Sequence, residues 1–362
     1  MTTIKEDLKS KNNNSDYNYL DDSDYLSSDD ENDGYFSEDS YMEDTPIIDS
    51  IKKKNFGTFL NLLKSNKNKN ELVYDNEIER KINPLQVALK YYQDYNDINY
   101  ITKLLEYYDS NDGILFSVFN MDCYNYYKSK NIDIFNYQDE LGDNLILWAT
   151  RYSNLKMVYD IYENLDDKLI TNQLGLNCFL SSALNCNSNN IFEISRFLYD
   201  KNNKYINSVD NNSDNFLMLL ENNNRVKPSD KNKSIIVKFL MDRGIDINHK
   251  NSQGKNILMI LIENSNFSTW KYLLDYVYFY IRKDIDLEQE DNNNENILNY
   301  CIQKIENEIK INNKKNSINL KKDFVYLREI INLIIKSKKQ ISDDDAKLLK
   351  KFKQNMIKYK MI

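Results

Sequence analysis

The side chains that most often do chemistry in proteins are scarce in this sequence. One histidine, His249, and four cysteines, Cys123, Cys178, Cys186 and Cys301, are spread over 362 residues. No two cysteines are spaced Cys-x-x-Cys, and one histidine with scattered thiols does not make a zinc ligand set. The seven glycines form neither a G-x-G-x-x-G nor a Walker loop. A Ser-His-Asp triad could use only His249, so we expect no enzyme, no metal site and no cofactor.

Asparagine dominates the remaining polar chemistry. The chain has 55 Asn and 28 Tyr against 3 Pro, and its hydrophobic share is 41%. An excess of Asn, Lys, Tyr and Ile is what AT-rich codons impose, so most of these residues reflect the genome. The length fits two or three globular domains or one long repeat array.

Charge is distributed unevenly along the chain. Residues 1–50 hold 15 acidic and 3 basic side chains, whereas residues 301–362 hold 16 basic and 7 acidic ones. Blocks of like charge repel one another and are typical of disordered tails. We therefore expect residues 1–43 to be a disordered acidic tail. Phosphorylation of its serines and folding of the tail onto the basic C-terminal end both stay open.

The compartment is predicted from missing signals. The first residues lack the apolar stretch of a secretory signal. The most apolar run, residues 257–262, is far shorter than a membrane span. Cysteines without a secretory signal are expected to be reduced. We expect an intracellular, cytoplasmic protein that is monomeric and whose main partner is neither a membrane nor a nucleic acid.

A repeat is the strongest signal in the sequence. Asparagine recurs in one register, at spacings of 33, 38, 41 and 40 residues: Asn144, Asn177, Asn215, Asn256 and Asn296. Each is followed by an apolar stretch with helical period, a polar gap and a second apolar helix. The clearest second helices are predicted at 155–162, 191–199, 235–241 and 270–278. Pairs of short helices at this period predict an all-α helical-hairpin solenoid.

The segment 239–258 resembles the ankyrin-repeat signature. Gly244, Asp246 and Asn248 match the turn after the outer helix, and Gly254 matches the glycine of the hairpin. The resemblance covers residues 44–340 as seven or eight degenerate units, one of them near residues 113–119. Asn replaces the usual Thr, and no His follows the motif's Leu, but Asn can accept the same helix-capping hydrogen bond. Composition and divergence are similar to those of ankyrin proteins encoded by amoeba-infecting giant DNA viruses.

The resemblance implies a non-enzymatic scaffold for protein–protein interaction, with a host protein as the partner if the chain is viral. In this family the hairpin fingers and inner helices form a concave, partner-binding face. The matching residues here are Asp139, Asp143, Trp148, Asp210, Asp214, His249, Lys250, Lys255, Ile260 and Tyr300. For Trp148 two interpretations stay open: packing between repeats, which we favour, or a binding hot spot in the groove.

Residues 341–362 predict a basic amphipathic helix. Ser342 is its expected N-cap, followed by three aspartates in the first turn. Its apolar face, formed by Leu348, Leu349, Phe352 and Met356, is wide enough to cap the last repeat. The alternatives are an adaptor for a membrane surface or for nucleic acid. Some related viral ankyrin proteins end in an F-box-like ubiquitin-ligase segment that opens with Leu-Pro, but the last proline here is Pro228.

Overall fold

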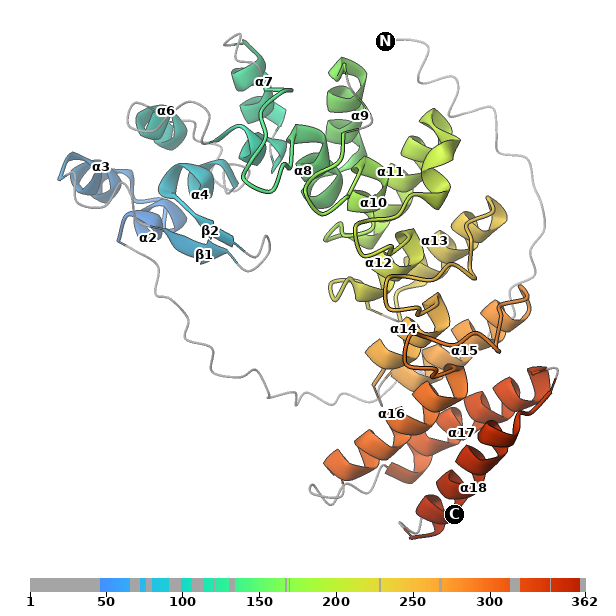
Figure 1. Ribbon diagram of the computed structural model, residues 1–362. Helices are drawn as coiled ribbons and strands as arrows, with labels where there is room; N and C mark the ends of the chain where they lie inside the picture. Colours follow the sequence, from blue (N-terminus) through green and yellow to red (C-terminus); the bar gives the residue numbers. More distant parts are fainter. Residues whose placement is uncertain are drawn as a thin grey trace, which may run out of the picture. The chain divides into compact units, whose positions relative to one another are not determined.

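The described part of the chain is a stack of short helices (Figure 1). The computed structural model describes residues 46–358 except 66–71, 76–79, 91–98, 106–112, 120, 130–133, 167, 169, 228, 267–268, 313–319 and 339. The acidic tail predicted for residues 1–43 lies outside these residues. The predicted all-α repeat array is confirmed, with one small two-stranded sheet added to it.

The N-terminal part of the array combines short helices with that sheet. Its elements are α2 (Pro46–Lys52), α3 (Phe56–Lys64), β1 (Val73–Asp75), β2 (Arg80–Ile82), α4 (Pro84–Lys90), α6 (Asn99–Leu105), the 3₁₀ helix η2 (Leu115–Phe119) and α7 (Met121–Ser129). β1 and β2 pair antiparallel, with buried Val73 opposite buried Ile82. This hairpin is not predicted from the sequence, because three-residue strands are too short to show an alternating pattern.

From residue 145 the chain repeats as an inner helix followed by an outer helix. The pairs are α8 (Leu145–Tyr152) with α9 (Leu155–Asn164), α10 (Cys178–Ser182) with α11 (Ser188–Lys201), α12 (Phe216–Asn222) with α13 (Lys231–Asp242), α14 (Ile257–Asn264) with α15 (Trp270–Ile281), and α16 (Ile297–Asn312) with α17 (Leu320–Ser337). A 3₁₀ helix, η3 (Asn203–Asn207), follows α11. The inner helices contact one another in chain order, and η2 contacts both α4 and α8. All four predicted outer helices lie within α9, α11, α13 and α15.

The inner helices are buried on nearly every side. In α14 the six residues 257–262 are all buried, because the helix contacts α12, α16 and its own outer helix. This explains why the inner segments are continuous apolar runs rather than half-polar ones. The outer helices are amphipathic, and their exposed side chains include Tyr159, Ile235 and Tyr278.

The repeated asparagines begin the inner helices, as their spacing predicts. The side chains of Asn144, Asn177, Asn215 and Asn256 each accept the backbone N–H three residues later, at 2.9–3.2 Å. Such a bond satisfies one of the four N–H groups that a helix N-terminus leaves without an intrahelical partner. Asparagine therefore fills the capping position that the family motif gives to threonine.

The last helix, α18 (Asp343–Lys358), contacts α16. The Ser342 hydroxyl caps it by accepting the Asp345 N–H at 3.0 Å. The Asp345 side chain is buried and accepts hydrogen bonds from Asn296 and Lys338. Leu348, Leu349 and Phe352 are half-buried against the core. The side chain of Met356 lies outside the described residues.

Candidate partner-binding groove

A hairpin turn precedes each inner helix from α8 to α16. We call these turns the fingers: residues 139–143, 172–176, 210–214, 251–255 and 291–295. Each opens on an Asp or Asn whose Oδ1 accepts the backbone N–H groups two and four residues later. In the fourth finger, Asn251 accepts from Gln253 and Lys255, both at 3.0 Å. The opening side chain therefore holds the whole turn.

Neighbouring fingers are joined by backbone hydrogen bonds. The Gln173 N–H donates to the Leu141 carbonyl at 2.9 Å, and the Asn292 N–H donates to the Gln253 carbonyl at 3.0 Å. The two intervening junctions repeat this bond at 2.9 and 2.8 Å. The fourth residue of every finger has a positive φ: Gly142, Gly175, Ser213, Gly254 and Asn294. Fingers from residue 139 to residue 295 thus form one continuous ladder.

Side chains reinforce the ladder. Asn172 Nδ2 donates to Asp143 Oδ1 at 2.8 Å, and Asn251 Nδ2 donates to Asp214 Oδ1 at 2.9 Å. Both aspartates are buried, and burial raises the pKa of Asp214 although the amide of Asn251 opposes the shift. The ring Nε2 of His249 lies 2.7 Å from the Ser213 carbonyl, which ties the fourth unit to the third finger.

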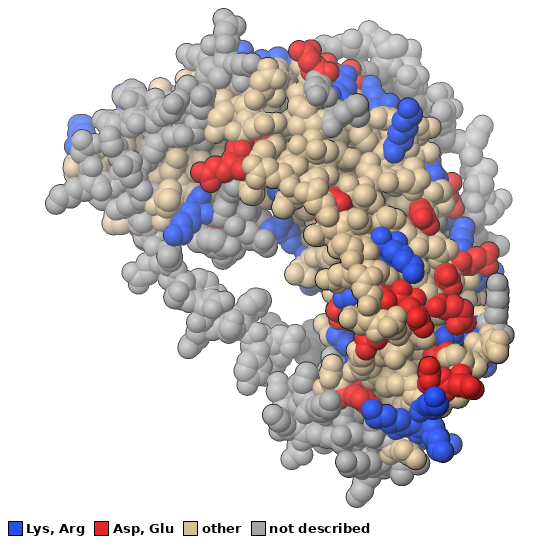
Figure 2. Space-filling model, viewed as in Figure 1, with Lys and Arg blue, Asp and Glu red and all other residues tan. Residues whose placement is uncertain are grey.

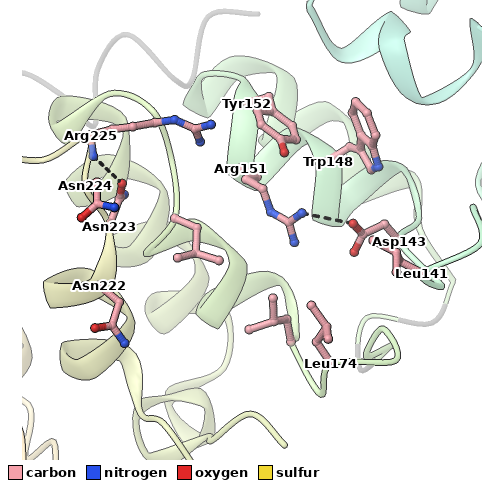
Figure 3. Close-up of a pocket in the computed structure, with 12 residues that line it drawn as sticks. Leu141, Asp143, Trp148, Arg151, Tyr152, Leu174, Asn222, Asn223, Asn224 and Arg225 are labelled. Carbon is pink, nitrogen blue, oxygen red and sulfur yellow. Dashed lines mark hydrogen bonds and ion pairs between the residues drawn. The ribbon is translucent and has the colours of Figure 1, made fainter. Parts of the chain in front are cut away.

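A cavity of about 490 Å³ opens between α8, the first two fingers and the loop after α12 (Figure 3). We call it the groove. It is lined by Leu141, Asp143, Trp148, Arg151, Tyr152, Leu174, Leu176, Leu184, Asn222, Asn223, Asn224 and Arg225. Its walls combine aliphatic and aromatic side chains with amides and two arginines, a mixture that suits a protein segment better than a purely apolar ligand.

Arg151 is the central charge of the groove. Its Nη1 donates to Asp143 Oδ2 at 3.1 Å, and only 14% of its side chain is exposed. Its Nε and Nη2 atoms are buried, and the guanidinium lies over the Tyr152 ring, 5.7 Å from the ring centroid. Burial by itself lowers the pKa of Arg151, but the Asp143 carboxylate outweighs burial and the pKa is raised. The guanidinium is therefore a largely buried cation held by Asp143 and Tyr152.

The rim of the groove is apolar. Leu141 and Leu174 occupy the tips of the first two fingers and are 40% and 51% exposed. At the same position the later fingers carry Asn212, Gln253 and Asn293, so only the first two tips are apolar. Two neighbouring exposed leucines beside a cavity are typical of a protein-interaction surface.

Trp148 belongs to the core as well as to the groove. It is 1% exposed, and its ring centroid lies 4.9 Å from that of Phe116 and 5.1 Å from that of Tyr152. Phe116 comes from the preceding unit, so Trp148 packs between repeats, which is the interpretation that the sequence favoured. Ile260, at the equivalent place in α14, is also buried, and neither side chain is an exposed hot spot.

The other predicted site residues of the later repeats are engaged within the array. Tyr300 is buried and donates to Asp291 at 2.8 Å. Lys255 pairs with Glu263 at 2.6 Å, and Lys250 donates to the Glu290 carbonyl at 3.3 Å. Lys250 is exposed and Lys255 is half-buried, so both could still reach a partner. Tyr300 is buried and contacts only other residues of the array.

The predicted aspartates hold the fingers in shape. Asp139 and Asp210 are the opening acceptors of their fingers, and Asp143 and Asp214 accept the amides described above. The sequence resemblance predicts these aspartates on a binding face, but a short polar side chain in a tight turn satisfies its own backbone first.

The predicted residues do not converge on one place. They extend from the first finger to α16, and only Asp143 and Trp148 line the groove. Sequence reasoning missed Leu141, Leu174, Arg151 and Arg225. The available signal for the leucines was an apolar residue just before Gly142 and Gly175, at a turn position that is polar in the later fingers.

The described residues contain no cluster of three or more His, Cys, Asp or Glu side chains that could hold a metal ion. Burial raises the pKa of Cys123 and of Cys178 to about 12, so both are thiols at neutral pH. In this part of the chain no helix is long and apolar enough to cross a membrane. Figure 2 shows acidic and basic side chains interspersed over the part that carries α13 to α15, without a continuous basic face in that view.

Comparison with known proteins identifies one segment. Residues 229–312 match the family model of ankyrin repeats (3 copies). A crystal structure of an ankyrin repeat domain from Acinetobacter baumannii aligns at 14% identity over 70% of this chain and 97% of that chain, with a TM-score of 0.41. No curated protein matches the sequence. The matched segment contains α13 to α16 and the last two fingers, and these residues, 229–312, are the part of the chain that matches ankyrin repeats.

Proposed function

We propose that this chain is a non-enzymatic scaffold that binds a protein partner in the groove. Ankyrin repeats generally mediate protein–protein interaction, and the groove is where this array combines exposed apolar side chains with polar ones. One observation carries the proposal: Leu141 and Leu174 are exposed at adjacent finger tips beside a cavity of about 490 Å³. An intracellular location, a monomeric state and a likeness to giant-virus ankyrin proteins remain predictions from the sequence.

The experiment compares two matched surface changes. Tagged full-length chain, the Leu141→Ser/Leu174→Ser variant and the Leu72→Ser variant are used to capture proteins from the native cell. Leu72 is 50% exposed and precedes β1, so it matches Leu174 in exposure but is not a groove residue. We expect Leu72→Ser to retain the captured partner and the double variant to lose it. Equal capture by all three proteins would contradict the proposal.

For α18 we propose a capping role rather than an adaptor role. The supporting observation is that Asp345, in the first turn, is buried between Asn296 and Lys338. In a helix held this way the apolar side chains Leu348, Leu349 and Phe352 pack against the array. The membrane and nucleic-acid alternatives predict that deleting residues 341–362 abolishes binding to liposomes, RNA or DNA, whereas a cap predicts lower stability with no change in such binding.

A further inference from the structure

A second hollow of the surface lies on the outer helices and shares no lining residue with the groove. It is a cavity of about 420 Å³ between α15 and α17, which contact each other and lie side by side in Figure 1. We call it the outer cleft. We propose that the outer cleft binds an amphipathic helix of a partner protein that carries a basic residue and, two turns away, an acidic residue. This surface is separate from the groove and goes beyond the function proposed for it.

The outer cleft follows its two helices for about two turns. Its lining is Leu274, Asp275 and Tyr278 of α15 and Glu329, Asn332, Leu333 and Lys336 of α17. Residues three, four and seven positions apart lie on one face of a helix, so each helix contributes one stripe. Glu329 and Lys336 are separated by about 10.5 Å along the axis of α17. A third helix fits such a cleft, because its ridge of side chains packs into the space between two neighbouring helices.

Apolar side chains of the outer cleft are partly exposed. Tyr278 is 50% exposed, and Leu274 and Leu333 are half-buried. The Arg282 guanidinium lies 5.5 Å from the Tyr278 ring centroid, and the tyrosine stays half-exposed beside it. The apolar stripe of a partner helix would remove these side chains from water, which favours binding without regard to charge.

The charges of the outer cleft are ordered along both helices. On each helix a basic residue follows an acidic residue seven positions later: Asp275 and Arg282 at α15, Glu329 and Lys336 on α17. None of these four side chains forms an ion pair with a residue that the structure describes, and Lys271, one turn before Asp275, is not in the lining. Outer helices of successive units run in the same direction, because each follows its inner helix in the same repeat. The outer cleft therefore has an acidic end and a basic end.

Two earlier junctions of outer helices use their charges within the array. Lys201 of α11 pairs with Glu163 of α9 at 2.6 Å, and Lys283, which follows α15, pairs with Asp242 of α13 at 3.8 Å. The outer cleft instead keeps opposite, unpaired charges at its two ends. It therefore favours a ligand that carries the complementary charges at the same spacing. A partner helix meets this requirement with a basic residue at the acidic end and an acidic residue two turns away.

The test first selects helical peptides that depend on Tyr278. A displayed library of alanine-rich peptides of about 18 residues, long enough to be helical and randomised on one face, is panned against the full-length chain. Peptides that also bind Tyr278→Ser are discarded. Those retained must still bind Tyr159→Ser, a matched change at a 44% exposed tyrosine of α9. We expect Lys or Arg at one position, Asp or Glu seven positions away, and Leu, Ile, Met or Phe between them.

Charge reversal then locates the contacts. Glu329→Lys should weaken a labelled selected peptide about tenfold, and changing the basic residue of the peptide to Glu should restore binding to this variant. Lys336→Glu should behave in the same way when the acidic residue of the peptide becomes Lys. Glu193→Lys reverses a charge at an exposed glutamate of α11 and should leave binding unchanged. All three variants should keep the circular dichroism of the parent, because the substituted side chains are exposed.

The outcomes separate this inference from the proposal for the groove. If the Tyr278-dependent peptides lack the charge pair, or if both charge reversals bind the peptide as the parent does, the inference is wrong. A library that yields no Tyr278-dependent peptide contradicts the outer cleft as a docking surface. If sedimentation shows a dimer of the full-length chain that Tyr278→Ser dissociates, a second copy occupies the cleft and the partner helix is contradicted. The Leu141→Ser/Leu174→Ser variant should bind the peptide as the parent does, and loss of binding there would place the peptide in the groove instead.

Discussion

Asparagine occupies two different positions in the repeat, and at these positions its side chain has three hydrogen-bonding roles. It opens a finger at Asn251, where Oδ1 accepts two backbone N–H groups. It caps an inner helix at Asn256, where Oδ1 accepts the Met259 N–H. The same Asn256 donates its Nδ2 to the Asp286 carbonyl of the next unit at 3.4 Å. One side chain with both an acceptor and a donor thus serves its own helix and the next repeat.

Glycine is required at one finger position for two separable reasons, and a matched pair of substitutions separates them. Gly254 and Gly244 have φ values of 78° and 81°. A Cβ on Gly254 would lie 2.8 Å from the Asn292 backbone nitrogen, whereas a Cβ on Gly244 would meet nothing within 4 Å. We expect Gly244→Ala to cost about 1 kcal/mol, from the left-handed backbone alone. Gly254→Ala should cost about 3 kcal/mol, because the finger junction must also open.

Urea unfolding followed by far-ultraviolet circular dichroism measures both free energies. Gly244→Ala is the internal control for backbone strain. If both variants lost the same free energy of unfolding, the fingers would not pack as closely as their hydrogen-bond ladder requires.

At the scale of elements, α18 takes the place that the next repeat takes elsewhere in the stack. Asn215 and Asn256 donate their side-chain amides to the carbonyls of Asp246 and Asp286 in the following unit. The equivalent Asn296 donates instead to the Asp345 side chain in α18 at 3.0 Å. A carboxylate from the final helix therefore substitutes for a backbone carbonyl and supports our proposal that α18 is a cap.

The docking of α18 should depend on pH through Asp345. Burial tends to raise the pKa of Asp345, but the hydrogen bonds from Lys338 and Asn296 outweigh burial and lower it. A carboxyl whose pKa is lower in the folded state stabilises that state above its unfolded pKa of about 3.9, and the stabilisation is lost as pH falls through the folded value. We expect Asp345→Asn to cost about 3 kcal/mol at pH 7, and the difference from the parent to shrink below about pH 4.

Chemical unfolding of the parent and the variant at pH 7, 5 and 3.5 measures this dependence. Asp344→Asn is the matched control, because Asp344 is 91% exposed and pairs only with Lys347 of its own helix among the described residues. The control should unfold like the parent. If Asp345→Asn lowered the free energy of unfolding by the same amount at pH 7 and at pH 3.5, the ion pair of Asp345 with Lys338 would not be what holds α18 in place.

The sequence predicted elements better than it predicted the site. The register of Asn144 and its equivalents located the inner helices, because a capping side chain followed by an apolar run is a local signal. Arg151 and Arg225 line the groove together, although they lie in different repeats. They come to one cavity only when the units stack, and no short segment of sequence encodes that stacking. The prediction of Asp214 as a binding residue has the same weakness, because its burial depends on Asn251 of the neighbouring repeat.

For the molecule as a whole, the finger geometry extends the repeat beyond the segment that matches the family. The match begins at residue 229, yet the fingers at 139–143, 172–176 and 210–214 have the same side-chain and backbone bonds as the later ones. The groove lies in this earlier part, beside the two fingers that precede Asn144 and Asn177. Its apolar finger tips, Leu141 and Leu174, have polar counterparts in the three later fingers.

The most direct test of the groove as the partner-binding surface is site-specific photocrosslinking in the native cell. A benzophenone amino acid is placed at Leu174 in one protein and at Leu72 in another, since the two side chains are 51% and 50% exposed. We predict that illumination links the Leu174 position to a discrete partner protein and leaves the Leu72 position without that product. A crosslink of equal yield at both positions, or one confined to the Leu72 position, would contradict the groove as the binding surface.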